Sequence, residues 1–465
     1  MSVAATPMHQ QFLIDGLRAI VGDVGLVLGS DLAMRSCDPF RDVPPKGGVL
    51  VRPANVTEVA AVLRWCHKHS QRIVTHGGRT GVAGAAYADE SELVLSLERM
   101  RRVEEIDPVG LVAVTEAGIT LEGLQQAVAE KGLLYPIDLG AKGSATIGGT
   151  IATNAGGNRV VRWGMTRANV LGLEVVLADG TVVQAMNRLL KNNTGYDIKH
   201  DFIGSEGTLG VITRAVLKLV PAPVTQFVMF ASVPSYAAVL SLLDAARKLP
   251  TLSAFEVMWH DYYVLMAESG TGREPVKPDQ PYYLLMEAMG YQQAIDEQLF
   301  MGFLEAAHDQ GWLVDAACAT SERQIAELWR VREGAEVLMR TMHPFVTFDV
   351  SVDVRRAEEF SSEVRTQLAR SYPAMKAVTF GHLGDSNLHL GVHVGADTLR
   401  EEVNIERCVY DVVKRYGGAL TAEHGIGRFK REFFPDHVSP GALAVMQRKR
   451  AALDPARLLN REVLF

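Results

Sequence analysis

Apolar residues recur at helical and strand-like intervals along the first part of the chain. The predicted elements are a helix at 9–21, a strand at 49–53, a helix at 55–70 and a strand at 72–76. Asn55 or Thr57 can cap the second of these helices. A further helix over 121–131 begins after Thr120 and ends at Gly132. Helices and strands therefore alternate before residue 135.

Two glycine-rich segments interrupt this pattern, at 77–85 and at 140–157. In the second, six of 18 residues are glycine and only Lys142 is charged. Glycine lets a backbone lie close against a flat or phosphorylated ligand. The first segment is spaced as Gly78-x-x-Gly81-x-x-Gly84, and a strand rather than a helix follows it. Both features speak against a dinucleotide-binding Rossmann unit. Tight turns without a ligand are the structural alternative.

Strand-like runs continue at 170–183, with Asp179-Gly180 as a hairpin turn, and at 207–221. Pro221 and Pro223, which follow this run, indicate a domain boundary near residue 222. Beyond it lie predicted strands at 227–233, 253–259 and 282–288, helices at 235–247 and 321–340, and a final helix at 440–453. This order predicts a second domain of the α+β class.

Composition narrows the class of protein. A chain of 465 residues with 48% apolar and 22% charged residues can bury more than one core. Its net charge of −7 argues against a nucleic-acid surface. The sequence shows neither a secretory leader nor an apolar run of the roughly 20 residues that a membrane span needs. Four scattered cysteines without a C-x-x-C pair favour reduced, mostly buried thiols in a cytoplasmic protein.

The stretch TFGHLGDSNLHLGVHV (379–394) concentrates three histidines around a likely turn. If a hairpin closes on residues 384–387, His382 faces His389, with Cβ atoms about 4.5–5.5 Å apart. Two imidazoles at that separation can share one metal ion. Each histidine taken alone is more typical of an ordinary solvated or hydrogen-bonded side chain.

Several motifs occur in a fixed order: the two glycine-rich segments, IGSEGTLGVIT (203–213), GHLGDSNLHL (381–390) and AEHGIGR (422–428). Together they resemble the FAD-dependent dehydrogenases of D-2-hydroxy acids, including the D-lactate, D-2-hydroxyglutarate and glycolate oxidoreductases. The likeness runs from about residue 40 to 465. It implies an α+β fold: a two-part FAD-binding domain of the vanillyl-alcohol-oxidase or PCMH type at 1–222, an α+β substrate domain with an antiparallel sheet and the metal site at 223–425, and a C-terminal segment at 426–465 that packs back near the FAD domain.

The resemblance also implies which residues hold a non-covalent FAD. The first loop would wrap the pyrophosphate, the second segment would hold the rest of the cofactor, and later residues would meet the adenine and the flavin surroundings. These residues are His76, Gly77, Gly78, Arg79, Thr80, Gly81, Pro136, Asp138, Gly140, Ser144, Thr146, Gly148, Gly149, Thr153, Asn154, Ala155, Gly156, Gly157, Glu206, Gly210, Val211, Ile212 and Asn460. His76 is expected to be structural, with no covalent bond to FAD.

For the metal, the histidine pair needs a third ligand, and Glu423 offers a carboxylate. Two imidazoles and one carboxylate with an open position form the ligand set of a catalytic zinc site. The resemblance supports His382, His389 and Glu423 as ligands of Zn²⁺, with Mn²⁺ as the alternative. His424 would then take the proton of the substrate hydroxyl while hydride passes to flavin N5.

Arg332 matches the family position that binds the substrate carboxylate, with Arg330 as the competing candidate. Where the D-2-hydroxyglutarate enzymes carry a lysine, this chain has Thr347, and where they carry an asparagine it has Gly391. D-lactate or a bulkier acid such as D-mandelate therefore competes with D-2-hydroxyglutarate. Trp259 and His260 could line the pocket for the substrate side chain, although an aromatic residue there is more often part of a core.

The expected acceptor of the electrons is not NAD but an electron-transfer flavoprotein, a quinone or a cytochrome, and the resemblance favours a homodimer. Two other functions fit the same motifs: a metal-free FAD oxidase of this fold, and a non-catalytic flavin-binding subunit of a glycolate oxidase complex.

Overall fold

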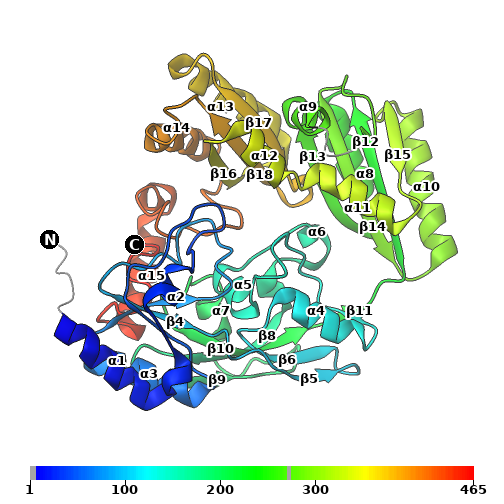
Figure 1. Ribbon diagram of the computed structural model, residues 1–465. Coiled ribbons are helices and arrows are strands. Elements are labelled where there is room, and N and C mark those ends of the chain that lie inside the picture. The colour runs from blue at the N-terminus through cyan, green and yellow to red at the C-terminus, as the bar shows by residue number, and fades with distance from the viewer. Residues whose placement is uncertain (1–6, 270–273) are drawn as a thin grey trace. The chain divides into compact units, whose positions relative to one another are not determined.

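The computed structural model describes residues 7–269 and 274–465, and the chain divides into two compact units (Figure 1). The first unit comprises Met1–Gly156, Met165–Ala222 and His424–Phe465, and the second comprises Gly157–Gly164 and Pro223–Glu423. The sequence predicts that residues 1–222 belong to one domain. The structure instead assigns Gly157–Gly164 to the second unit, where helix α6 (Val160–Trp163) contacts the sheet.

Within the described residues, the first unit contains a four-stranded sheet, a five-stranded sheet and a two-stranded ribbon. Strands β1 (Leu26–Leu28), β2 (Val49–Val51), β4 (Glu92–Ser96) and β3 (Arg72–His76) form the four-stranded sheet in that order. Strands β5 (Val103–Asp107), β6 (Val112–Glu116), β10 (Val211–Lys218), β8 (Val170–Val176) and β9 (Val182–Ala185) form the five-stranded antiparallel sheet. A two-stranded ribbon joins β11 (Val220–Pro221) to β7 (Leu133–Leu134).

Capping side chains start the helices of the first unit where the sequence predicts. Asn55 accepts a hydrogen bond from the N–H of Glu58 at the start of α3, and Thr120 does the same for Gly123 at the start of α4. The helices are α1 (Pro7–Val21), α2 (Gly29–Ala33), α3 (Val56–Lys68), α4 (Leu121–Ala129), α5 (Ile147–Thr153), α7 (Lys199–Phe202) and α15 (Pro440–Leu453). Apolar faces of α1, α3, α4 and α5 share one core with both larger sheets.

The second unit is built on a seven-stranded antiparallel sheet within the described residues, which confirms the predicted α+β class. Its strands, in spatial order, are β15 (Asp315–Cys318), β12 (Thr225–Val233), β14 (Tyr282–Gly290), β13 (Leu252–Trp259), β17 (Lys376–Gly381), β18 (Asn387–His393) and β16 (Val346–Ser351). Its helices are α6, α8 (Tyr236–Ala246), α9 (His260–Glu268), α10 (Gln293–Asp309), α11 (Glu322–Arg332), α12 (Ala335–Met342), α13 (Ala357–Ser371) and α14 (Glu402–Arg415).

Both faces of this sheet are covered. Alternate residues of β12 to β14, such as Phe230 and Met258, share a core with α9, α11 and α12. The strands β13 and β14 are buried along their whole length, and α8 and α10 contact β12 and β14. Such strands read as continuous apolar runs, so a charged residue inside one of them requires a buried partner.

The helix predicted over 321–340 is in fact two helices, α11 and α12, separated at Glu333 and Gly334. The hydroxyl of Tyr262 bridges the break, donating to the carbonyl of Arg332 (2.7 Å) and accepting from the N–H of Gly334 (3.2 Å). A Cβ on Gly334 would lie 2.1 Å from Met266 Sδ. The prediction of one helix was wrong because apolar spacing does not reveal this tertiary contact, which ends α11 at Arg332.

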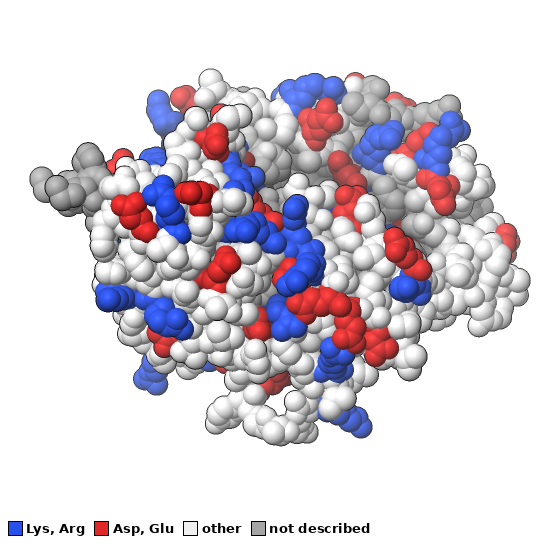
Figure 2. All heavy atoms as spheres, turned by 60° about the horizontal axis from the view of Figure 1, so that its bottom comes forward, with Lys and Arg blue, Asp and Glu red and all other residues white. Residues whose placement is uncertain are grey.

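No helix in the described part of the chain is long and apolar enough to cross a membrane. Basic and acidic side chains are interspersed over the face in Figure 2. Ion pairs such as Arg188–Glu105 (2.6 Å) join exposed side chains of opposite charge. The four cysteines, all within the described residues, are free. Cys37 and Cys66 are buried as expected, whereas Cys318 is exposed.

The two glycine-rich segments lie against each other in the first unit. A Cβ on Gly78 would lie 2.0 Å from the carbonyl oxygen of Ser144, and one on Gly77 would lie 2.7 Å from Thr146 Oγ1. A Cβ on Gly81 or Gly140 would meet nothing within 4 Å. The segments therefore form one close backbone contact, with open space at its edges.

Gly78→Ala is expected to lower the free energy of unfolding of the first unit by about 2–3 kcal/mol, because its methyl group would push the backbone of residue 144 away. Gly81→Ala, three residues along the same loop, should change it by about 0.5 kcal/mol or less. Urea denaturation of the two cofactor-free variants beside the parent checks this. Equal stability of the two variants would contradict the close contact.

Candidate active site

Strands β16, β17 and β18 bring the predicted histidines together, in a register that differs from the expected one. His389 pairs with Phe380 on β17 and with Asp349 on β16. The prediction that His382 faces His389 directly was wrong, because the chain turns through the short 3-10 segment Leu383–Asp385 and not through a tight four-residue loop. The slip is two residues, which keeps both side chains on one face. Their rings are 5.2 Å apart, edge to face.

The imidazole of His382 is hydrogen-bonded to the carboxylate of Glu256, a residue that sequence reasoning did not select. Its Nδ1 donates to Glu256 Oε1 at 2.8 Å, and its Nε2 lies 4.0 Å from Glu423 Oε1. Val257 pairs with Gly381, so Glu256 and His382 are the next neighbours along β13 and β17. The second oxygen of Glu256 accepts from Arg332 Nε at 2.7 Å.

These three groups are buried, with no exposure of Glu256 and 6% and 5% exposure of His382 and Arg332. Burial alone would lower the pKa of His382, but the carboxylate of Glu256 outweighs it and raises that pKa to about 9. Burial opposes ionisation of Glu256, yet the charges of His382 and Arg332 lower its pKa. The carboxylate of Glu256 therefore lies between the guanidinium of Arg332 and the Nδ1–H of His382, and it favours positive charge at Nε2 of that ring, from either a proton or a metal ion.

Glu423 lies at the end of a segment that a second buried carboxylate fixes. Asp349 Oδ2 accepts hydrogen bonds from Thr421 Oγ1 (2.9 Å), the N–H of Ala422 (3.1 Å) and the N–H of Glu423 (2.9 Å). The carboxylate of Glu423 itself accepts from the N–H of Gly157 at 2.9 Å. The N–H of Gly157, an expected FAD contact, is thus already used by a predicted metal ligand.

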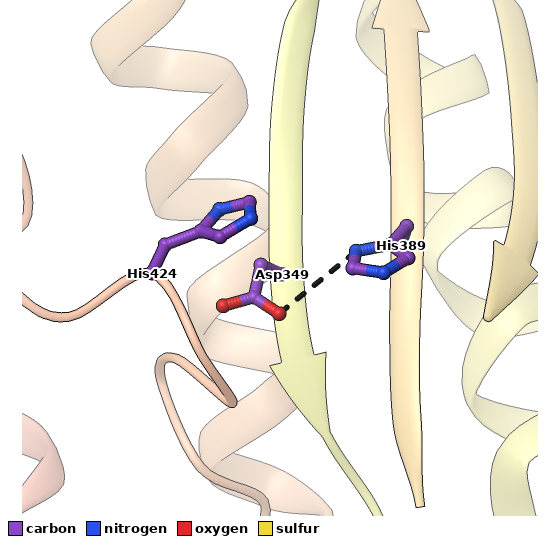
Figure 3. Close-up of side chains that lie close together, drawn as sticks. All are labelled: Asp349, His389 and His424. Atoms are coloured by element: carbon purple, nitrogen blue, oxygen red, sulfur yellow. Dashed lines mark ion pairs between the residues drawn. The ribbon is translucent and has the colours of Figure 1, made fainter. Parts of the chain in front are cut away.

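Asp349, His389 and His424 each offer a metal-ligating atom, and these atoms all lie within 4.8 Å of one another (Figure 3). Asp349 Oδ1 is 3.9 Å from His389 Nδ1 on the neighbouring strand. His424 follows Glu423 directly, where the chain passes from the second unit into the first. This cluster shares His389 with the predicted ligand set but contains Asp349 and His424 in place of His382 and Glu423.

Arg332 and Arg330 lie in different surroundings. Arg330 is exposed, whereas Arg332 is buried beside His382, with its guanidinium 4.8 Å from the ring centre of Phe380. Because Glu256 occupies its Nε, a substrate carboxylate would have to meet the Nη groups of Arg332. The structure therefore favours Arg332 over Arg330 as part of the site.

Other residues of the motif have varied environments. Burial raises the pKa of Asp385 to about 7, and its Oδ1 accepts from the N–H of Asn387 (3.3 Å). The side-chain amide of Asn387 is buried, with neither polar atom bonded within the described residues. His393 Nδ1 donates to the carbonyl of Pro344, as expected of a structural histidine. Trp259 donates to Glu358 and packs on aromatic rings, so it belongs to the core.

Two of the expected FAD residues, Glu206 and Asn460, link the C-terminal segment to the rest of the first unit. Glu206 accepts from the N–H groups of Ile426 (2.9 Å) and Gly427 (2.7 Å), and burial raises its pKa. Asn460 accepts from the N–H of Thr75 (3.0 Å) and donates to the carbonyl of Glu206 (3.0 Å). Both side chains therefore anchor backbone, and a direct contact of either with FAD stays a prediction.

His76 has one ring nitrogen without a partner. Its Nε2 donates to the carbonyl of Ala86 at 2.8 Å, while its Nδ1 is buried and unbonded within the described residues. Burial lowers the pKa of His76 to about 4, so the ring is neutral at pH 7. A neutral buried ring is consistent with the expected structural role, and the orphaned nitrogen and the glycine contact beside it fit a loop that approaches a bound cofactor.

Glu256 and Asp349 are the functional residues that sequence reasoning did not select. Both stand inside apolar strands, in SAFEVMW and TFDVS. An acidic residue within a fully buried strand is rare without a partner, and that could have marked both positions.

Comparison with known proteins identifies the family. Residues 48–186 match the family described as FAD binding domain, and residues 222–464 match that described as FAD linked oxidases, C-terminal domain. A D-2-hydroxyglutarate dehydrogenase of Xanthomonas citri pv. viticola is 37% identical over 94% of this chain and 93% of its own length. The mitochondrial D-2-hydroxyglutarate dehydrogenase of Bos taurus is 40% identical over 92% of this chain and 79% of its own.

The chain belongs to the FAD-linked D-2-hydroxyacid dehydrogenases. Solved structures agree on the fold of this dehydrogenase. The 4-ethylphenol oxidase of Gulosibacter chungangensis aligns with a TM-score of 0.76 at 17% identity, covering 98% of this chain and 97% of its own. A p-cresol methylhydroxylase aligns with a TM-score of 0.75 at 16% identity, covering 98% and 96%. The predicted PCMH-type fold and the FAD cofactor are therefore confirmed.

Asp349→Asn should loosen the segment of this dehydrogenase that carries Glu423. An amide oxygen is a weaker acceptor for the three donors of residues 421–423, and a loss of about 1.5–3 kcal/mol is expected. Hydrogen exchange of the amides of Ala422 and Glu423 should accelerate about tenfold or more. Glu287→Gln, which alters a buried carboxylate on β14, is the control and should leave these amides unchanged. Unaltered exchange in Asp349→Asn would contradict the anchoring role.

Proposed function

We propose that this dehydrogenase oxidises a D-2-hydroxy acid to the 2-oxo acid with the help of one divalent cation, Zn²⁺ or Mn²⁺, bound by His382, His389 and Glu423. The observation that carries the proposal is the position of His382, whose Nδ1 is occupied by Glu256 while its Nε2 faces Glu423. Names of relatives support the substrate class, since several are called D-2-hydroxyglutarate dehydrogenase.

The donors fit such an ion. A tetrahedral zinc with bonds near 2.0–2.1 Å holds its ligand atoms about 3.4 Å apart. The 4.0 Å between His382 Nε2 and Glu423 Oε1 would need to close only slightly. We assign Asp349 to a supporting role, because one of its oxygens already accepts three hydrogen bonds.

The bound groups supply the redox chemistry and the Lewis acid. When bound, FAD would supply the oxidant that takes the hydride from the substrate's α-carbon. A divalent cation makes an α-hydroxyl more acidic. Within the chain, His424 takes the hydroxyl proton, and its place directly after Glu423 puts an imidazole beside the ligand set. The Nη groups of Arg332 bind the substrate carboxylate and so orient the α-carbon.

The residues of the sheet next to the histidines support a proposal about the charge of the substrate's side chain. Thr347, Gly391 and Val378 form the next rung on the face that carries Asp349 and His389. This rung offers no charge, and a Cβ on Gly391 would contact Val378 at 3.2 Å and Phe345 at 3.6 Å. We propose that uncharged side chains, as in D-lactate or D-mandelate, compete well with D-2-hydroxyglutarate. The proposed electron acceptor is an electron-transfer flavoprotein, a quinone or a cytochrome, and the proposed assembly is a homodimer.

Anaerobic mixing with D-lactate, D-mandelate or D-2-hydroxyglutarate should bleach the visible absorbance of the bound flavin, and the L-enantiomers should not. Removing the metal with a chelator should slow bleaching by roughly 100-fold or more, and Zn²⁺ should restore it. His382→Ala should behave like the chelated enzyme, whereas His393→Ala on the same hairpin should keep the parent rate. A metal-free enzyme with the full parent rate would refute the role of the cation.

Thr347→Lys should shift the substrate preference. The added ammonium would lie on the rung beside the histidines and attract a second carboxylate, so kcat/KM for D-2-hydroxyglutarate relative to D-lactate should rise about tenfold. Thr347→Met, of similar length without charge, is the control and should not raise that ratio. An unchanged ratio in both variants would place the substrate side chain elsewhere.

A further inference from the structure

Glu256 binds two side chains that the proposed function assigns to different tasks. Its Oε1 accepts from Nδ1 of His382 at 2.8 Å, and its Oε2 accepts from Nε of Arg332 at 2.7 Å. Each oxygen thus serves one partner, and the carboxylate has no exposure to solvent. Nη2 of Arg332 lies 3.5 Å from Nδ1 of His382, so the three groups form one compact cluster.

We infer that Glu256 is a positioning residue that couples the metal-binding imidazole of His382 to the guanidinium of Arg332 that binds the substrate carboxylate. The inference rests on the proposed function. By accepting at Nδ1, the carboxylate fixes the ring orientation and leaves Nε2 for the cation, as carboxylates behind metal-bound histidines do. By accepting at Nε, it orients the Nη groups of Arg332. One side chain therefore sets the relative position of the metal and the substrate carboxylate.

Another buried carboxylate of the same sheet, that of Glu287, provides a comparison for the ion pair of Glu256 and Arg332. Glu287 on β14 is also fully buried and accepts from Arg159 (3.1 Å), Ser253 (2.8 Å) and Gln226 (2.6 Å). No histidine is among these three partners. An arginine and neutral donors are thus enough to hold a buried carboxylate in this sheet, and balancing Arg332 does not by itself require Glu256 to contact His382.

The carboxamide introduced by Glu256→Gln has nearly the same shape as the carboxylate but only one acceptor oxygen. Its oxygen can accept from either His382 or Arg332, and its NH₂ group then faces the other donor. One of the two partners must lose its acceptor and reorient. Glu256→Asp keeps both oxygens on a shorter side chain and should recover part of the loss.

The experiment uses the FAD-loaded enzyme and measures Zn²⁺ binding by competition with a chromogenic chelator. Glu256→Gln should bind Zn²⁺ roughly 10–100-fold more weakly than the parent. Glu256→Asp should fall between them, and Glu287→Gln should stay within about twofold of the parent. At saturating Zn²⁺, Glu256→Gln should still show a KM for D-lactate raised about tenfold, because Arg332 is displaced as well. A variant that merely destabilised the fold would not raise KM in the surviving folded enzyme.

If Glu256→Gln binds Zn²⁺ as tightly as the parent, the inference is overturned while the proposed function stands. If the parent itself binds no Zn²⁺ and loses no activity with chelator, both are overturned. If the variant fails to fold, the inference is tested on the parent protein with Zn²⁺ bound, by NMR of its ¹⁵N-labelled histidines. A proton on Nδ1 of His382 with the metal on Nε2 supports the inference, and the metal on Nδ1 overturns it.

Discussion

Burying a carboxylate in a protein costs several kcal/mol unless cations and hydrogen-bond donors surround it. The second unit buries two at one place, Glu256 and Asp349, and the arrangement of the site follows from how each is compensated. Glu256 is compensated by the guanidinium of Arg332 and by the Nδ1–H of His382, while Asp349 uses the donors of residues 421–423 and lies beside His389. The polar groups needed to stabilise these carboxylates include the groups proposed to bind metal and substrate.

This requirement explains how residues far apart in the chain reach one site. Strand pairing places Glu256 next to His382 and Asp349 next to His389. The hydroxyl of Tyr262 bridges the end of helix α11 at Arg332, whose guanidinium reaches Glu256 on β13. Asp349 holds the segment before His424, and Glu206 holds the segment after it. The segment that carries Glu423 is thus tied to strand β16 by the buried carboxylate of Asp349, which limits the freedom that metal binding would otherwise have to remove.

Sequence reasoning found the elements whose signals are local. The spacing of residue types predicted the helix caps at Asn55 and Thr120, the glycine-rich segments and the histidine motif. It missed what depends on distant contacts. The two-residue slip of the β17–β18 hairpin arises because Leu383–Asp385 form a helical turn, and the break after Arg332 depends on Tyr262, seventy residues earlier. Glu256 and Asp349 were overlooked because an acid inside an apolar strand has no periodic signature, although its unusual surroundings could have marked it.

The fold and the chemistry of this dehydrogenase are set by different residues. Phenol-oxidising structures share the fold with TM-scores near 0.75 at 16–17% identity, so the architecture alone does not select a reaction. What distinguishes a 2-hydroxy acid as substrate is a carboxylate beside an alcohol, and the proposed function assigns a guanidinium to the carboxylate and a Lewis acid to the alcohol. In this chain one carboxylate, Glu256, touches the side chains proposed for both tasks. A change at Glu256 would therefore alter metal binding and substrate binding together, whereas a change on the uncharged rung of Thr347 and Gly391 would alter only which side chain is accepted.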